Sequence, residues 1–270
     1  RKKKRKLKIV PVFILLLFIT VLVGLAIYGP KYLKNKVNIP KKPDEPIVEP
    51  KKDPVVTTAK MVMVGDALIH SSVYNDAARL ANWNGYDFKP QISIIKEYVK
   101  DYDIRYYNQE TILGGTSLGL SDYPTFNSPQ EVGDAFIDAG FNLVSLATNH
   151  TVDRGKNAVL ESRKHWNTKQ DIVQAVGSYS SLEEKQAIES RVLEVNGIKY
   201  AMLNYTYGTN GMPVEDSYLV NVWPTDIDNI NNPETDTKYN QYKETVVKDL
   251  EALRDKVDVL MVAMHWGVEY

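Results

Sequence analysis

Hydrophobic and polar residues alternate along the chain in blocks that predict strands and helices from about residue 59 onward. Apolar runs typical of buried strands cover 60–64, 103–107, 142–146 and 257–264, and helical spacing of apolar residues covers 91–100, 129–139, 156–167 and 239–256. Residues 191–195 and 198–204 flank Asn196–Gly197, the strongest short signal for a β-hairpin. Because strands alternate with helices and a hairpin is present, the pattern predicts an α/β fold with mixed sheets.

The longest apolar run lies near the N-terminus and predicts a transmembrane helix. Residues 9–28 carry no charge, and at about 1.5 Å per residue such a helix reaches about 30 Å, the thickness of the hydrocarbon core of a bilayer. A cleaved signal peptide is the competing interpretation, but its apolar region is shorter, and Gly24–Leu25–Ala26 is a poor cleavage site. The basic residues 1–8 place the N-terminus in the cytoplasm and the remainder outside, so we expect a single-pass protein of the cell membrane.

Composition divides the rest of the chain into a spacer and one domain. Residues 29–57 are rich in Pro, Lys and Glu and lack a helical apolar period, which is typical of a semi-extended linker. Residues 58–270 have the apolar patterning of a single globular domain. The chain begins at Arg1 and stops at Tyr270, directly after an apolar strand, so we expect it to be a C-terminally truncated part of a longer protein.

The distribution of charge argues against nucleic acid as a partner. Residues 1–52 hold 14 basic and 3 acidic residues, whereas the remainder holds 19 basic and 31 acidic residues, a net charge of −12. An acidic domain lacks the cationic surface that phosphate backbones require. The basic segment fits the flank of a membrane span instead. Cysteine is absent from the sequence, which excludes disulfides, thiolate metal sites and a cysteine nucleophile.

Polar side chains able to bind metal or phosphate follow four of the predicted strands. In α/β sheets ligands bind beyond the carboxyl ends of the strands, where side chains from distant parts of the chain converge. Oxygen and nitrogen donors of these types suit Mn, Zn, Fe or Mg. The residues are Asp66 with His70, Glu110 after Asn108, Asn149 with His150, and His265.

Each of these residues also has an ordinary structural interpretation. Gly65–Asp66 fits a turn, His70 a histidine on a helix face, and Glu110 a solvated carboxylate. Asn149–His150 fits a helix cap, and His265 fits a buried histidine with satisfied hydrogen bonds. Three of the four histidines nevertheless fall in strand-end motifs, and this coincidence favours a common site. His165, in the middle of a predicted helix, is interpreted as structural.

A further segment, Tyr205 to Gly211, also follows a predicted strand. Its glycines allow a ligand to approach the backbone closely, and Thr209 and Asn210 are candidate contacts to a polymer or a phosphate. A glycine-containing turn with buried tyrosines is the alternative interpretation.

Five stretches together resemble the bacterial capsule-synthesis CapA family, whose members include PgsA-type proteins of poly-γ-glutamate production. The resemblance runs in order from about residue 60 to the end of the chain. The stretches are VGDALIHSSVY (64–74), YYNQETILGG (106–115), FNLVSLATNHTVDRG (141–155), NYTYGTNGMPV (204–214) and MHWGVEY (264–270).

The resemblance implies a fold similar to calcineurin-like metallophosphoesterases, a layered αββα sandwich with mixed sheets and two divalent metal ions. Carried over residue by residue, the implied metal ligands are Asp66, His70, Glu110, Asn149 and His265. His150 would protonate the leaving group in a metal-assisted hydrolysis. Two departures stand out: the first motif is Asp-x-x-x-His where those enzymes have Asp-x-His, and the final Gly-x-His-x-His-type motif does not follow Trp266.

Two functions follow as expectations. The first is a membrane-anchored, extracytoplasmic role in the synthesis or export of an anionic capsule polymer such as poly-γ-glutamate, with other capsule-synthesis membrane proteins as partners. The second is a metal-dependent phosphoesterase acting on a phosphate ester of the cell envelope, which leaves enzymatic activity open. The candidate substrate contacts for either function are Asn108, Asp153, Thr209 and Asn210.

Overall fold

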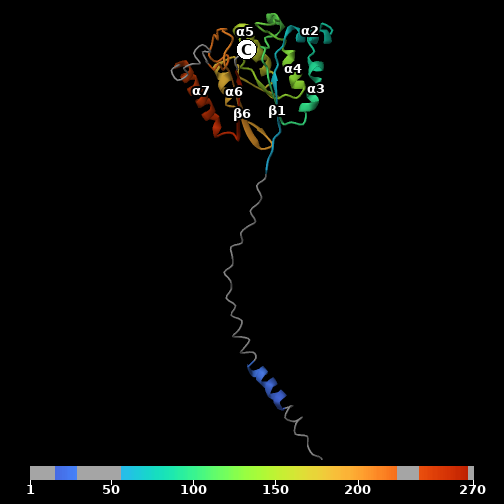
Figure 1. Cartoon of the computed structure of the whole chain (residues 1–270), viewed down its shortest axis with the longest axis vertical. Helices are drawn as coiled ribbons and strands as arrows, with labels where there is room; N and C mark the ends of the chain where they lie inside the picture. The colour runs from blue at the N-terminus through green and yellow to red at the C-terminus, as the bar shows by residue number, and fades with distance from the viewer. Residues whose placement is uncertain (1–15, 29–55, 224–236, 267–270) are drawn as a thin grey trace, which may run out of the picture. The chain divides into compact units, whose positions relative to one another are not determined.

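The computed structural model describes residues 16–28, 56–223 and 237–266, and the chain divides into two compact units, 1–55 and 56–270 (Figure 1). Residues 16–28 of the first unit are helical. Within the described residues, no helix combines the length and the apolar character needed to cross a membrane. Residues 9–15 of the predicted span lie outside the described part of the chain.

A four-stranded parallel sheet forms the centre of the second unit. Its strands are β1 (Met61–Asp66), β2 (Ile104–Asn108), β3 (Leu143–Ser145) and β4 (Gln174–Val176), and their order in the sheet follows their order in the chain. The connections contain α2 (Ser71–Leu80), α3 (Lys89–Val99), the short 3₁₀ helix η1 (Thr116–Leu118), α4 (Glu131–Asp138) and α5 (Gly155–Asn167). Crossovers of one hand between successive neighbouring strands place their helices on one face of a sheet.

A second, mixed sheet contains the predicted hairpin. β5 (Leu193–Val195) pairs antiparallel with β6 (Ile198–Thr206), and β6 pairs parallel with β7 (Val259–His265) over seven residue pairs. Helix α6 (Leu182–Glu189) precedes this sheet, and α7 (Thr237–Arg254) connects β6 to β7. The mixed α/β character expected from the sequence is therefore confirmed.

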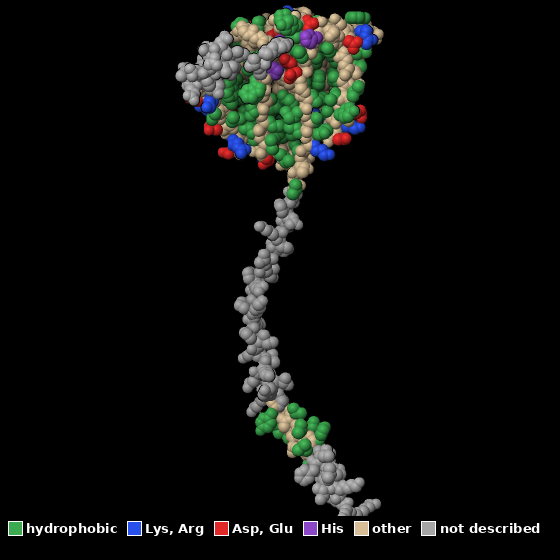
Figure 2. Space-filling view, viewed as in Figure 1, with side chains coloured by type: hydrophobic (Ala, Val, Ile, Leu, Met, Phe, Trp, Pro, Cys, Tyr) green, Lys and Arg blue, Asp and Glu red, His purple; other side chains and the backbone are tan. Residues whose placement is uncertain are grey.

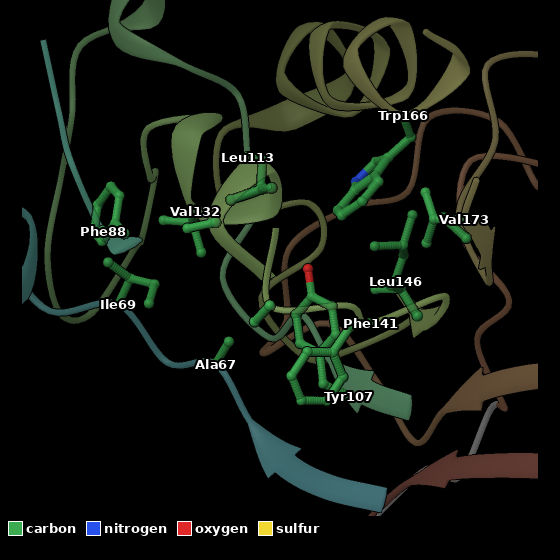
Figure 3. Close-up of a cluster of buried hydrophobic side chains, with 14 of the residues drawn as sticks. Ala67, Ile69, Phe88, Tyr107, Leu113, Val132, Phe141, Leu146, Trp166 and Val173 are labelled. Carbon is green, nitrogen blue, oxygen red and sulfur yellow. The ribbon is translucent and has the colours of Figure 1, made fainter. Parts of the chain in front are cut away.

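Alternating side chains of the strands build three apolar layers. Tyr106 of β2 joins Tyr200 and Met202 of β6 in a cluster between the two sheets. The neighbouring Tyr107 points to the opposite face of the first sheet, where Figure 3 shows it near Phe141 and Trp166 in a cluster that includes the helices. On the outer face of the second sheet, Ala201, Leu203 and Tyr205 of β6 pack with Val246 and Leu253 of α7.

The carboxyl ends of β1, β2 and β3 lie at one edge of the first sheet because the strands are parallel. The carboxyl end of β7 reaches the same region, since His265 contacts Asn108 and Asn149. Figure 2 shows His side chains beside acidic side chains at the end of the domain toward which β1 runs in Figure 1. This edge holds the candidate functional site.

Candidate active site at the carboxyl ends of the strands

Asn108 is fixed at the end of β2 by polar contacts on several sides. Its side-chain Nδ2 donates to Asp66 Oδ1 at 2.7 Å, and the same nitrogen lies 3.5 Å from His265 Nδ1. Its Oδ1 accepts a hydrogen bond from Ser145 Oγ, which in turn lies 2.7 Å from the hydroxyl of Tyr106. Asn108 therefore connects the ends of β1, β2, β3 and β7, and it is buried.

His265, the last residue of β7, lies close to polar side chains from the ends of the other strands. Its Nε2 lies 2.9 Å from Asn149 Oδ1 and 3.8 Å from Glu110 Oε1. An amide oxygen only accepts, so Nε2 carries the proton and Nδ1 is left as an acceptor toward the Asn108 amide. Burial lowers the pKa of His265, while the nearby Asp66 acts in the opposite direction.

His150 is held by a buried carboxylate. Its Nδ1 lies 2.7 Å from Asp153 Oδ2, and the same oxygen accepts the backbone N–H of Phe126 at 2.7 Å. The backbone N–H of His150 donates to Thr148 Oγ1, whose hydroxyl donates to the carbonyl of Glu110 at 2.7 Å. This arrangement fixes the ring orientation and places the proton on Nδ1 toward the carboxylate, which leaves Nε2 as the reactive nitrogen.

His70, immediately before α2, is paired with a residue that sequence reasoning did not single out. Its Nδ1 lies 2.7 Å from Asp122 Oδ1. Asp66, by contrast, is engaged with Asn108. The role of His70 as a metal ligand beside Asp66 stays a prediction.

An open pocket of about 770 Å³ lies over these residues. A volume of this size is within the usual range of about 300–1,000 Å³ for small-molecule sites. The pocket is lined by the three predicted site histidines, by other polar residues and by apolar side chains, and its described lining contains no Lys or Arg. The lining is Leu68, His70, Glu110, Tyr123, Pro124, Thr125, Phe126, Asn149, His150, Asp153, Tyr207, Asn210, Met212, His265 and Trp266.

The remaining predicted residues lie in the pocket or beside it. Asp66 and Asn108 line a smaller neighbouring cavity of about 120 Å³, which shares His265 with the main pocket. Asn210 lines the main pocket in a left-handed backbone conformation, and its Oδ1 accepts from Asn149 Nδ2 at 3.3 Å. Thr209 is used locally, because its hydroxyl donates to the carbonyl of Met212 at 2.7 Å. The substrate contacts predicted for these residues stay predictions.

Several residues of the site carried no signal in the sequence. Phe126 lies against His150 edge to face, with 4.7 Å between ring centroids, and Asp122 holds His70. Ser145 orients Asn108, and the ring of Tyr207 stacks near that of His265. Phe126 and Asp122 come from a loop, Ser145 is the last residue of β3, and Tyr207 follows β6; no motif spacing marks any of them as part of the site.

The side chains around His265 carry oxygen and nitrogen atoms of the kinds that bind divalent metals. Asn149 Oδ1 accepts from His265 Nε2 at 2.9 Å, and Nε2 would become a metal donor if the imidazole proton moved to Nδ1. The carboxylate of Glu110 lies on the same side of the ring. In the described part of the chain, however, no three His, Asp, Glu or Cys side chains gather closely enough to hold a metal, so the amides Asn149 and Asn108 would complete the set.

Together the fold and the site define a layered α/β domain whose polar pocket lies at the carboxyl ends of its strands. The chain belongs to the bacterial capsule synthesis protein family PGA_cap, which it matches over residues 60–270. This match confirms the resemblance stated from the sequence motifs. The curated proteins give no match.

Proposed function

We propose that this protein is held in the cell membrane by residues 9–28 and acts outside the cytoplasm in the synthesis or export of an anionic capsule polymer. Membership of the capsule synthesis family supports the process, and the uncharged run with its basic flank supports the anchor. Poly-γ-glutamate is the polymer that the sequence resemblance implies. Other capsule-synthesis membrane proteins would be its partners.

The charge of the pocket bears on how such a polymer binds. Its described lining carries the carboxylates Glu110 and Asp153 and lacks Lys and Arg. A polyanion brought to this surface needs bound cations to offset the repulsion, since like charges at close range disfavour binding. Divalent ions held by the donors around His265 would supply that charge, which links the polymer to a metal site.

An experiment in cells tests whether the proposed membrane anchor is needed for capsule formation. The full chain would be expressed in a capsule-forming bacterium that lacks its own copy of the gene, and cell-bound and released polymer would be measured. We expect the wild-type chain to restore the capsule and a chain lacking residues 9–28 to fail while remaining folded. Full restoration by the chain without residues 9–28 would contradict the anchored role.

We also propose a chemical activity for the pocket, hydrolysis of a phosphate ester with divalent metal ions, in a fold similar to the αββα metallophosphoesterases. The observation that carries it is His150, held by Asp153 beside the donor set of Glu110, Asn149 and His265. Two bound ions would supply an activated water and positive charge for the phosphoryl group. His150 is placed to give a proton to the departing oxygen, and Asp153 holds its ring for that transfer.

The activity is tested on the full chain in detergent with Mn²⁺, Zn²⁺, Fe²⁺ and Mg²⁺ in turn. The probe is bis(p-nitrophenyl) phosphate, which reports hydrolysis by colour. We expect metal-dependent turnover in the wild type and about 100-fold or greater loss in His150→Gln. A folded wild-type protein that binds no metal and hydrolyses nothing would overturn the enzymatic proposal and leave the capsule role standing.

A further inference from the structure

Two histidines that line the same pocket both pack against one aromatic ring. The rings of His70 and Phe126 are 5.1 Å apart at an interplanar angle of 84°, and those of Phe126 and His150 are 4.7 Å apart at 83°. Both histidines line the pocket of about 770 Å³. Phe126 is itself buried, so both imidazoles pack against a ring that is held in place.

Hydrogen bonds hold the carboxylate of Asp122, which contacts His70, as they hold the carboxylate of Asp153, which contacts His150. Asp122 Oδ1 lies 2.7 Å from His70 Nδ1 and accepts the backbone N–H of Tyr123 at 2.8 Å. Its Oδ2 accepts the backbone N–H of Ser71 at 3.0 Å and also the Ser71 hydroxyl. These bonds, the Ser71 hydroxyl first among them, hold the pKa of Asp122 well below its ordinary value, so it faces His70 as a carboxylate.

The pairs His70–Asp122 and His150–Asp153 therefore have the same arrangement. In each, Nδ1 of the imidazole meets an oriented carboxylate, and Nε2 has no hydrogen-bond partner among the residues that the structure describes. His265 differs, because both of its ring nitrogens lie close to side chains of the site. An imidazole held in this way presents a single nitrogen of defined tautomer to whatever occupies the pocket.

We propose that His70, oriented by Asp122, is a second catalytic histidine of this pocket and works with His150 as an acid–base pair. This inference rests on the proposed phosphoesterase activity. His70 Nε2 accepts a proton from the attacking water as the new P–O bond forms. His150 starts this step as the imidazolium, with Nδ1–H on Asp153, and its Nε2 gives the second proton to the oxygen of the leaving group as the other P–O bond breaks. One water is consumed, one alcohol and one phosphate are released, and solvent returns each histidine to its starting state.

The different exposure of the two rings supports this division of roles. The side chain of His70 is 45% exposed and that of His150 is 10% exposed. The exposed imidazole is next to bulk water, which can take away the proton that it accepts. The buried imidazole lies nearer to Asn149 and the metal-type donors, where the charged phosphoryl group would be neutralised.

The test uses the full chain in detergent, Mn²⁺ and bis(p-nitrophenyl) phosphate, with the wild type compared to His70→Gln, His70→Gly, Asp122→Asn and His150→Gln. We expect His70→Gln to lower kcat about 100-fold with little change in KM, because general acid–base groups contribute about 10²–10⁴-fold. Added imidazole should restore part of kcat in His70→Gly but not in His150→Gln at the same concentration. Asp122→Asn should lower kcat by a smaller factor. Asp76→Asn, an exposed aspartate on α2, is the matched control.

The alternative outcomes point to different conclusions. Loss of bound Mn²⁺ in His70→Gln would make His70 a metal ligand and overturn the acid–base role. A kcat loss that imidazole does not restore, or wild-type kcat in His70→Gln while His150→Gln is inactive, would overturn this inference and leave the proposed function intact. A wild type without hydrolysis would overturn both. If His70→Gly fails to fold, as judged by circular dichroism, His70→Gln and Asp122→Asn carry the same comparison.

Discussion

His265 Nε2 lies 2.9 Å from Asn149 Oδ1, although the two residues are 116 positions apart in the chain. Asn149 follows β3 of the parallel sheet, and His265 ends β7 of the mixed sheet. The contact therefore joins the two sheets of the sandwich at their shared carboxyl edge. It also brings together an amide oxygen and an imidazole nitrogen, two kinds of atom that bind divalent metals.

Removing the Asn149 side chain should weaken metal binding without unfolding the domain. We expect Asn149→Ala to lower the affinity for Mn²⁺ about 10-fold or more, because one oxygen donor is lost and His265 loses its partner. The measurement is titration calorimetry of the full chain with Mn²⁺. Asn157→Ala, at an exposed position on α5, is the matched control and should bind as the wild type does. Equal affinities in both variants would remove Asn149 from the metal site.

Asp153 is expected to act by orienting His150, and its substitution should affect both turnover and stability. In Asp153→Asn one oxygen of the carboxylate becomes an amide N–H₂ group. His150 Nδ1 and the backbone N–H of Phe126 both use Oδ2, so the amide nitrogen takes the place of Oδ1, which is buried and has no hydrogen-bond partner among the described residues. We expect a loss of about 1–3 kcal/mol in the free energy of unfolding, from the buried unsatisfied donor.

Turnover separates this orienting role from direct contact with substrate. If Asp153 only holds His150, Asp153→Asn and the double variant with His150→Gln should have the same low kcat, with KM nearly unchanged. A raised KM in Asp153→Asn would instead favour the predicted substrate contact. Hydrolysis of bis(p-nitrophenyl) phosphate and urea unfolding provide the two measurements.

Much of the fold could be predicted because its strands are continuous apolar runs bounded by turn residues. β1, β2, β3, β7 and the β5–β6 hairpin all fall where the pattern placed them, within two residues at their ends. β4 was missed since Gln174–Val176 is only three residues long. Helix α6 was missed although Ser181 accepts from the backbone N–H of Glu184, a capping pattern with Glu three residues after Ser.

The site was predictable only in part, for a related reason. A parallel sheet brings the ends of its strands to one edge, so strand-end residues such as Asp66, Asn149 and His265 could be grouped from the sequence. Other contacts could not be grouped in this way. Asp122 binds His70, 52 positions away, and Asn204 binds backbone groups 57–59 positions away at the ends of β3 and β7. Local spacing carries no information about such contacts.

Gly177 should be intolerant of any side chain because it lies against Asn204. It has a φ of +110°, and a Cβ there would lie 2.0 Å from Asn204 Oδ1 and 2.6 Å from the backbone nitrogen of Ala147. Asn204 accepts from the backbone N–H groups of Leu146 and Ala147 and donates to the carbonyl of Ala263, so it links the two sheets. We expect Gly177→Ala to cost about 3 kcal/mol or more in the free energy of unfolding.

The matched control for this packing effect is Gly119→Ala. Gly119 also has a positive φ, +75°, but a Cβ there would meet no atom within 4 Å. It should show only the backbone strain, about 1 kcal/mol. Equal losses in the two variants, measured by urea unfolding, would mean that φ alone matters and that contact with Asn204 does not.

Glu189 at the end of α6 should make stability fall as pH rises. Burial raises its pKa above the ordinary value of 4.5, while its Oε1 accepts from the hydroxyl of Tyr179 and from Asn221 Nδ2. Below pH 4.5 the group is protonated in both the folded and unfolded chains. As pH rises from there through the raised pKa, the unfolded chain ionises first, so the free energy of unfolding decreases.

Glu189→Gln keeps the accepting oxygen and removes the titrating carboxyl group. The free energy of unfolding of this variant, relative to that of the wild type, should therefore increase with pH from about 4.5 upward and then level off. Glu183→Gln on the same helix is the control of opposite sign. Hydrogen bonds at the helix start, from the backbone and then from Ser181, lower the pKa of Glu183. That variant should therefore lose stability relative to the wild type as pH rises toward 4.5. Urea unfolding between about pH 3 and pH 8 measures both trends. Parallel curves for Glu189→Gln and the wild type would show that burial does not disfavour the Glu189 carboxylate.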